Sequence, residues 1–287
     1  MAAPDLGKVG IWSLELRFRD ASEANDVAAE LDELGFGALW IPGGIDGEVL
    51  PDVAQRLSAT KRMVIATGIL NLWKHEPTDV AAWYKGLSDD HKNRVMLGIG
   101  ISHGPIIGEA WAKPIAKTRS FLDGLEASGM EMDHTCLAAL GPKMMALSGE
   151  RTAGAHPYLV SPEHTAEARA ILGPDKLLMP EQGVIMEEDP VKARELGLQA
   201  LTHYRLLPNY RNNWKRLGFT EDEIENVSDR LFDALFAWGG TDKIVDRVKA
   251  HHDAGADHVC LQVIAGGTGG EFSDVLPKWR ELAAALL

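Results

Sequence analysis

The sequence lacks the features that mark several large classes of protein. It has only two cysteines in 287 residues, and both Cys136 and Cys260 stand in apolar runs that suit buried reduced thiols better than disulfides. The net charge is −13 and no basic stripe occurs, whereas phosphate-backbone binding needs clustered Lys and Arg. No run of 18 apolar residues is present, and residues 1–8 hold no apolar signal core. We therefore expect a cytoplasmic protein that neither binds nucleic acid nor spans a membrane.

Common metal and nucleotide motifs are also missing. No His-Glu-x-x-His or Cys-x-x-Cys occurs, and the adjacent pair His251-His252 would face different directions on a helix. Gly98, Gly100 and Gly104 do not have the spacing of the dinucleotide fingerprint. The sequence therefore predicts no metal site and gives little support to a Rossmann-type NAD site.

What the chain does contain is a regular alternation of strand and helix patterns. Apolar and β-branched runs predict strands at 8–14, 37–41, 62–70, 94–102, 136–140, 155–160, 182–186 and 258–263. Helical spacing follows each run, as in 22–34, where Ser22 is the expected cap and Gly35 the expected stop. Eight strand–helix units favour a single-domain (β/α)8 barrel over residues 1–287, although an open doubly wound sheet has the same alternation. A long helical region is expected at 190–238, between the seventh and eighth strands.

The stretch Arg94–Gly104 is the most informative one. It is an apolar strand pattern that ends abruptly in a polar turn carrying Ser102 and His103. Gly98 and Gly100 have no side chain, so a ligand ring or a neighbouring strand can approach the backbone there. Active sites of parallel barrels lie at the carboxyl ends of the strands. The stretch is thus either part of a ligand site or an ordinary core strand followed by a turn.

Six segments in order along the chain resemble the bacterial-luciferase-like flavin or deazaflavin oxidoreductases. They are Leu34–Trp40, Thr67–Trp73, Arg94–Gly100, Leu137–Met144, Gly154–Val160 and Ala254–Val259. Ser102-His103 after the fourth strand is similar to actinobacterial members of that family assigned to coenzyme F420. The resemblance implies a (β/α)8 barrel whose cofactor lies across the carboxyl ends of the strands.

The resemblance also implies roles for particular residues. The family carries a non-prolyl cis peptide in its third strand, against the central ring of the cofactor, and the matching pair here is Gly68-Ile69. Hydride transfer needs a held ring and excluded water, so small and apolar neighbours suit the ring. The expected cofactor-binding residues are Trp40, Gly68, Ile69, Gly100, Ser102 and the phosphate-side segment Gly154, Ala155 and His156.

Two residues are candidates for acid–base catalysis. His103 has an ordinary pKa near neutrality, and Glu15 follows the first strand near the barrel mouth. Relatives often place Asp or His after the second strand, where this chain has Pro42-Gly43-Gly44, with Asp46 two residues on. That departure leaves the general acid or base open. The glycine-rich stretch 266–270 after the eighth strand is either a phosphate cradle or a plain loop.

We expect an oxidoreductase that transfers a hydride between coenzyme F420 and a small organic substrate. A barrel that uses FMN and oxygen as a monooxygenase acting on paired donors is the first alternative. A non-catalytic barrel that binds flavin or deazaflavin is the second. The resemblance implies a homodimer, and the helical region at 190–225 could also form a lid over the barrel mouth.

Overall fold

The structure is a computed structural model that describes residues 2–43, 49–266 and 269–287. Its strands belong to one sheet in which every pairing is parallel. They are β1 (Val9–Trp12), β2 (Ala38–Ile41), β3 (Val64–Thr67), β4 (Leu70–Asn71), β5 (Val95–Gly100), β6 (Thr135–Leu137), β7 (Gly154–Ala155), β8 (Leu177–Leu178), β9 (Glu181–Ile185), β10 (Phe236–Trp238) and β11 (Val259–Val263).

The pairing order shows that the sheet curls back on itself. It runs β10-β9-β11-β1-β2-β3-β5-β6-β7-β8, with β4 paired to β5. Only Met179 and Pro180 separate β8 from β9, and the Cys260 N–H donates to the Pro180 carbonyl at this corner. β8, at one end of the pairing order, therefore leads directly into β9, next to the other end, and the single-domain α/β barrel fold expected from the sequence is confirmed.

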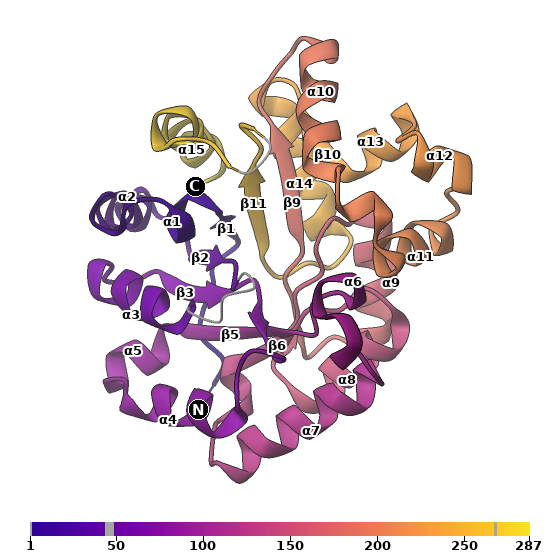
Figure 1. The fold of residues 1–287 in the computed structure, drawn as a ribbon. Coiled ribbons are helices and arrows are strands. Elements are labelled where there is room, and N and C mark those ends of the chain that lie inside the picture. Colours follow the sequence, from indigo (N-terminus) through magenta and orange to yellow (C-terminus); the bar gives the residue numbers. More distant parts are fainter. Residues whose placement is uncertain (1, 44–48, 267–268) are drawn as a thin grey trace.

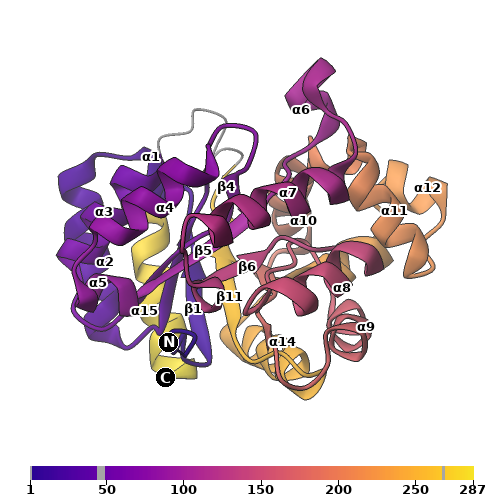
Figure 2. The same ribbon diagram turned by 90° about the horizontal axis from the view of Figure 1, so that it is seen from below.

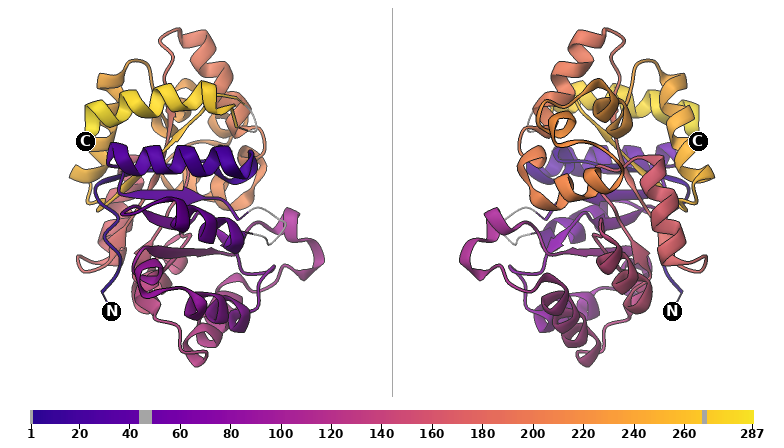
Figure 3. Two further views of the ribbon diagram at one scale, coloured as in Figure 1. Left: turned by 90° about the vertical axis from the view of Figure 1, so that its left-hand side faces the viewer. Right: turned by 90° about the vertical axis from the view of Figure 1, so that its right-hand side faces the viewer.

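Helices surround this sheet (Figure 1). They are α1 (Glu15–Phe18), α2 (Ala21–Leu34), α3 (Val49–Ala59), α4 (Pro77–Gly86), α5 (Asp89–Asn93), α6 (Gly104–Ile107), α7 (Pro114–Ala127), α8 (Pro142–Arg151), α9 (Pro162–Leu172), α10 (Pro190–Leu201), α11 (Pro208–Arg216), α12 (Glu221–Glu225), α13 (Asp229–Leu235), α14 (Thr241–Asp253) and α15 (Phe272–Leu286). Short 3-10 turns are η1 (Gly108–Ala110), η2 (Met132–His134) and η3 (Tyr204–Leu206). Figure 3 shows α2 and α15 side by side, so the first long helix and the last one cover the same sector.

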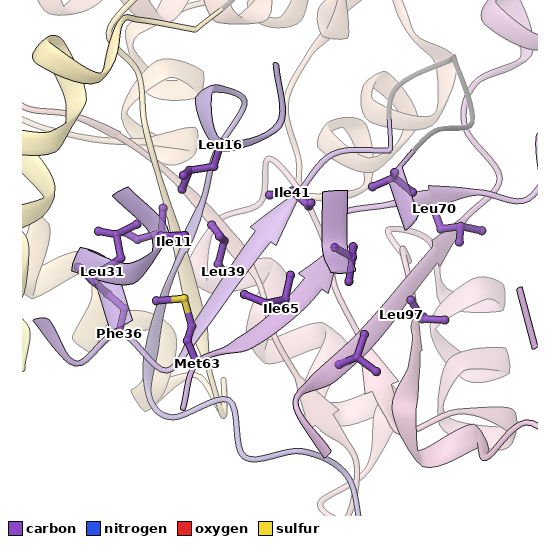
Figure 4. Packing of buried hydrophobic residues seen from close by; sticks show 14 of the residues in the cluster. Ile11, Leu16, Leu31, Phe36, Leu39, Ile41, Met63, Ile65, Leu70 and Leu97 are labelled. Carbon is purple, nitrogen blue, oxygen red and sulfur yellow. The ribbon is translucent and has the colours of Figure 1, made fainter. Parts of the chain in front are cut away.

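Alternate residues of the first strands point to opposite faces of the sheet. Ile11, Leu39 and Ile65 are fully buried neighbours on β1, β2 and β3, and they pack toward the surrounding helices (Figure 4). Burying one such side chain contributes about 1.5–3 kcal/mol. Trp40 and Ala66, one residue further along their strands, belong to a separate cluster inside the barrel. The period of two therefore builds an outer layer for stability and an inner layer beneath the mouth.

Three local expectations were wrong, each for a physical reason. The helical region at 190–238 ends earlier, because Phe236–Trp238 form β10 beside β9, and a run of three apolar residues has no readable period. The sixth strand is only Gly154–Ala155, since Pro157 has no N–H to continue the ladder. Asp20 rather than Ser22 caps α2, accepting the N–H groups of Ser22 and Glu23.

Other expectations are met. Gly35 ends α2 with a left-handed φ of 101°, as its position in the sequence predicted. Cys136 and Cys260 are both buried and free. In the part of the chain that the structure describes, no helix is long and apolar enough to cross a bilayer.

Candidate functional site

The third strand breaks between β3 and β4 at Gly68-Ile69, and the peptide bond there is cis, as the resemblance implied. The Trp12 indole N–H donates to the Gly68 carbonyl at 3.2 Å, and the Gly43 N–H donates to the Ile69 carbonyl at 3.1 Å. A Cβ on Gly68 would lie 2.4 Å from Trp12 Nε1, so this position has room only for glycine. The ends of β1, β2 and β3 are thus tied together at one point of the rim.

The two glycines of β5 are explained by the chain itself. A Cβ on Gly98 would lie 2.1 Å from the Thr67 carbonyl oxygen, and one on Gly100 would lie 2.6 Å from Ile69 Cγ1. Close approach of the neighbouring strand is therefore the reason for glycine at both positions. Gly100 provides the flat surface on which the Ile69 side chain rests, and a ring contact with either residue stays a prediction.

Ser102 and His103 follow β5 at the same rim. Ser102 has a φ of 59° in the left-handed region, which turns the chain toward α6. The His103 ring faces Tyr210 of α11 at 5.6 Å between ring centroids, and its side chain is hydrogen bonded to Asn209. Burial lowers the pKa of His103, so the imidazole is neutral at physiological pH. Its buried Nδ1 has no hydrogen-bond partner among the described residues, which leaves this atom for a ligand.

The residues 100–104 also have the Gly-x-Ser-x-Gly spacing of a nucleophile elbow, a signal that the sequence reasoning missed. The strand, the turn at Ser102 and α6 fit that motif, and α6 stands out from the rim in Figures 2 and 3. A nucleophilic serine needs a histidine base hydrogen bonded to its hydroxyl. Among the described residues no such bond to Ser102 is formed, so the geometry does not favour a serine hydrolase.

Trp40 and His156 lie inside the barrel. Their rings stack at 4.1 Å between centroids with 15° between planes, and Trp40 has no exposed surface. The Trp40 indole N–H donates to Nε2 of His258 at 3.2 Å, and His156 Nδ1 bonds the Met179 carbonyl at 2.7 Å. Burial lowers the pKa of both histidines to about 4. Nε2 of His156 has no hydrogen-bond partner among the described residues and would lie 3.2 Å from a Cβ on Gly68. Cofactor binding by Trp40 or His156 stays a prediction.

Gly154 and Ala155 are buried in the same interior. They form β7 and pair with Leu177 and Leu178 of β8. A Cβ on Gly154 would lie 1.9 Å from the Leu177 carbonyl oxygen, which explains the glycine by strand packing. A phosphate contact at this segment is likewise a prediction that the geometry leaves untested.

An aromatic-walled cavity of about 520 Å³ opens at the carboxyl ends of β1 and β11, next to α10 and η3. Trp12 and Glu15 line it from the β1 side, and Gln262 lines it from β11. Tyr158, which follows β7, and Tyr204 of η3 complete its wall. Sequence reasoning missed Tyr158, Tyr204 and Gln262, although Tyr158 belongs to a segment that carried the family resemblance.

The tyrosines are connected by hydrogen bonds and ring contacts. The Tyr158 hydroxyl donates to Oε1 of Gln262 at 2.7 Å, and Tyr158 and Tyr204 share a second hydrogen bond. Tyr158 lies 5.3 Å from Trp12 and 5.4 Å from Tyr204 between ring centroids. Tyr204 in turn contacts Tyr210, which faces His103. This row of rings leads from the cavity to the rim that carries His103.

Glu15 lies at the cavity but is engaged by the protein. It is 4% exposed, and its carboxylate accepts the Ser13 hydroxyl at 2.7 Å and the Gly270 N–H at 2.8 Å. Arg19 Nε donates to the Gly270 carbonyl at 3.1 Å from the other side. Glu15 thus holds the start of the loop before α15 against the end of β1. Direct catalysis by Glu15 stays a prediction.

Several predicted positions lie outside the described residues, namely Gly44, Asp46, Gly267 and Thr268. Gly266 and Gly269, on either side of the second gap, line the cavity. No group of three or more His, Cys, Asp or Glu side chains suited to a metal ion occurs within residues 2–43, 49–266 and 269–287.

The fold and this site define a class of protein, a parallel α/β barrel with an aromatic ligand cavity at the carboxyl ends of its strands. Residues 8–129 match the family described as luciferase-like monooxygenase. The match covers the first part of the chain and, together with the fold, agrees with the resemblance seen in the sequence. No curated protein sequence matches it at a significant level.

Solved structures of similar fold cover nearly the whole chain. An F420-dependent secondary alcohol dehydrogenase, in complex with an F420-acetone adduct, is 15% identical, with a TM-score of 0.71 and 100% of both chains covered. The coenzyme F420-dependent tetrahydromethanopterin reductase from Methanopyrus kandleri is 14% identical, with a TM-score of 0.66 and 98% of this chain and 97% of that chain covered. The oxygenating constituent of 3,6-diketocamphane monooxygenase from Pseudomonas putida, in complex with FMN, is 15% identical, with a TM-score of 0.67 and 99% and 96% covered. At these identities the likeness shows the fold.

Proposed function

We propose that this protein is an oxidoreductase that transfers a hydride between coenzyme F420 and a small organic substrate. The observation that carries the proposal is the cavity at the ends of β1 and β11, with Trp12 and two tyrosines in its wall. A flat heterocyclic ring needs apolar and aromatic surfaces with few polar groups, and this wall meets that need.

The residues present fit a deazaflavin or flavin. Trp12, Val263 and Ile264 offer apolar contact, while the Gln262 amide and the Tyr204 hydroxyl offer polar contact. When bound, the cofactor would accept or supply the hydride, and the chain's part is to hold the ring, orient the substrate and exclude water. We propose that Gly68, Ile69, Gly100 and Ser102, which were predicted from the sequence, form the surface next to this cavity and also contact the cofactor.

His103 is proposed as a hydrogen-bonding or acid–base residue. Its imidazole is neutral because burial disfavours the charged form, and its Nδ1 is buried without a partner among the described residues. A neutral imidazole in such a position can donate to or accept from a bound molecule. Glu15, which lines the cavity and accepts the Gly270 N–H, is proposed as the second acid–base residue.

Two kinds of relative support a flavin-type cofactor and differ on which one. Two of the similar structures are F420-dependent enzymes, and the third holds FMN. Because the third acts as a monooxygenase constituent, an FMN-dependent monooxygenase is the second candidate function. A non-catalytic barrel that binds either cofactor is the third.

Side-by-side titration of the purified protein with F420 and FMN, followed by fluorescence and calorimetry, tests the proposal. We expect micromolar affinity for F420 and much weaker binding of FMN. The reverse preference would support the monooxygenase, and binding without turnover of any hydride donor or acceptor would support the non-catalytic barrel. Failure to bind either cofactor contradicts all three. Sedimentation of the same sample tests the homodimer, which we propose from family resemblance.

A further inference from the structure

A buried carboxyl group lies below the cavity, and the proposed function gives it no role so far. Glu181 is the first residue of β9 and has no exposed surface. Its Oε2 accepts the N–H of Leu159 at 2.9 Å, and its Oε1 has no hydrogen-bond partner among the described residues. Burial raises the pKa of Glu181 to about 8, so the group holds a proton at neutral pH.

The groups that face Glu181 come from four elements and are all neutral at pH 7. They are Cys260 on β11, Tyr158 after β7, Tyr204 in η3 and Tyr210 in α11. Electrostatic interaction with Glu181 contributes to the raised pKa of each. The strand pairing with Cys260 and the hydrogen bond to the Leu159 N–H place the carboxyl group beside β11 and beside the backbone that follows Tyr158.

The strand register places Glu181 one layer below the polar wall of the cavity. Glu181 is paired with Cys260, and two residues further toward the mouth Gly183 is paired with Gln262. Gln262 is the acceptor of the Tyr158 hydroxyl, and Tyr158 directly precedes Leu159, whose N–H binds Glu181. The buried carboxyl group therefore binds the backbone of the segment that carries Tyr158 into the cavity wall.

We propose that Tyr158 is the acid–base residue for the oxygen atom of the substrate, and that Glu181 is the positioning residue that resupplies its proton. This inference rests on the proposed hydride transfer and names its substrate class: a ketone or aldehyde, or the corresponding alcohol. The substrate class follows from the polar groups of the wall, since phenol hydroxyls bind a single oxygen atom well.

The proton and electron changes of the step balance. When a hydride from the reduced cofactor adds to the carbonyl carbon, the π electron pair moves to the oxygen, which takes the phenolic proton of Tyr158. The resulting phenolate takes the proton of Glu181, and the carboxylate later regains a proton from water. Alcohol oxidation runs the same sequence in reverse. A phenol that serves this step contributes typically 10²–10⁴-fold to the rate.

Tyr158→Phe tests the acid–base role, with Tyr84→Phe as the matched control. Tyr84 is a buried tyrosine of α4 whose hydroxyl has no partner among the described residues. We expect Tyr158→Phe to bind F420 within about twofold of wild-type affinity while kcat falls by about 10²-fold. Tyr84→Phe should keep wild-type kcat. Normal turnover in Tyr158→Phe overturns the inference and leaves the proposed function intact.

Glu181→Gln tests the resupply of the proton. We expect the wild-type pH profile of kcat to show a limb near pH 8, the value to which burial raises the pKa of Glu181, and the variant to lose that limb. An unchanged profile contradicts the role of Glu181 even if kcat falls.

A readout without cofactor separates this inference from the proposed function. Infrared spectra of the wild type at pH 7 should contain the band of a buried protonated carboxyl group, and Glu181→Gln should lack it. Absence of that band from the wild type overturns the role of Glu181 as the group that resupplies the proton. If the band is present but the wild type turns over neither carbonyl compounds nor alcohols with F420, then the proposed hydride transfer has failed, and the role of Tyr158 fails with it.

Discussion

The interior of the barrel and its mouth use similar residues in opposite ways. In the interior, Trp40 stacks on His156 and donates to His258, both histidines bond to the backbone, and each of the three side chains is at most 1% exposed. At the mouth, Trp12 and Tyr158 keep open faces toward a cavity of about 520 Å³. Trp12 and Trp40 are paired residues on β1 and β2, so the cover that each side chain receives, rather than its depth along the strand, decides whether it stabilises the fold or borders a cavity.

The expected difference is that changes in the interior alter the free energy of unfolding, whereas changes at the mouth alter binding or turnover. Four experiments test it, and they are described from the largest expected effect to the smallest.

Among the four experiments, acidification should cause the largest loss in the free energy of unfolding, because histidines are buried both in the interior and on α9 and α14. Burial lowers the pKa of His156, His164 and His258 to about 4 and that of His251 to about 3. Between pH 6.5 and pH 4 the unfolded chain binds more protons than the folded one, so stability falls as pH falls through this window. Each shift to about 4 corresponds to roughly 3 kcal/mol. Urea unfolding at pH 7, 5.5 and 4 measures the loss, and a midpoint that does not change with pH would contradict neutral buried histidines.

His103→Ala should affect the mouth alone. We expect turnover with F420 to fall by about 10²-fold, because the variant lacks the imidazole that faces the rim, while the melting temperature changes little. His91→Ala on α5, away from the mouth, is the control and should keep wild-type turnover. Wild-type turnover in His103→Ala would show that the histidine only packs against Tyr210.

Trp40→Phe should affect stability and leave F420 affinity unchanged. The variant loses the hydrogen bond to His258 and part of the stacking on His156, at a cost of about 2 kcal/mol. Trp279→Phe is a matched control, since that indole is also buried but its Nε1 has no partner among the described residues. A weakened F420 affinity in Trp40→Phe would indicate that Trp40 belongs to the cofactor site. It would also contradict the expected difference between the interior and the mouth.

Glu15→Gln should have the smallest effect. In wild type, one carboxylate oxygen accepts from Ser13 and the other from Gly270. The amide of the variant is uncharged and has only one acceptor oxygen, so it can keep only one of these bonds. We therefore expect a loss of about 1 kcal/mol in stability. We also expect a severalfold weaker F420 affinity, measured by fluorescence titration, because Gly269, the neighbour of Gly270, lines the cavity. Glu33→Gln on α2 controls for loss of an exposed carboxylate. A fall in kcat at unchanged affinity would instead indicate direct catalysis by Glu15.

Much of the fold could be read from the sequence, because strands and helices of this barrel have local signatures. The strand at 9–12, the helix that ends at Gly35 and the glycines of β5 all follow from period and residue type. The cis peptide at Gly68-Ile69 was expected from family resemblance rather than from any periodic pattern. The sequence did not predict β10, because its three residues are too few to show a period.

The sequence alone determined the alternation that makes a parallel barrel, the resemblance to a family, and the rim at Ser102 and His103. Only the tertiary structure decided which residues face the cavity, because its wall joins Trp12, Tyr158, Tyr204 and Gln262 from segments up to 250 residues apart. Their meeting depends on strand register and on where α10 and η3 pack, and neither leaves a local pattern in the chain. For the same reason, only the tertiary structure places the buried carboxyl group of Glu181 beside β11 and next to the segment that carries Tyr158.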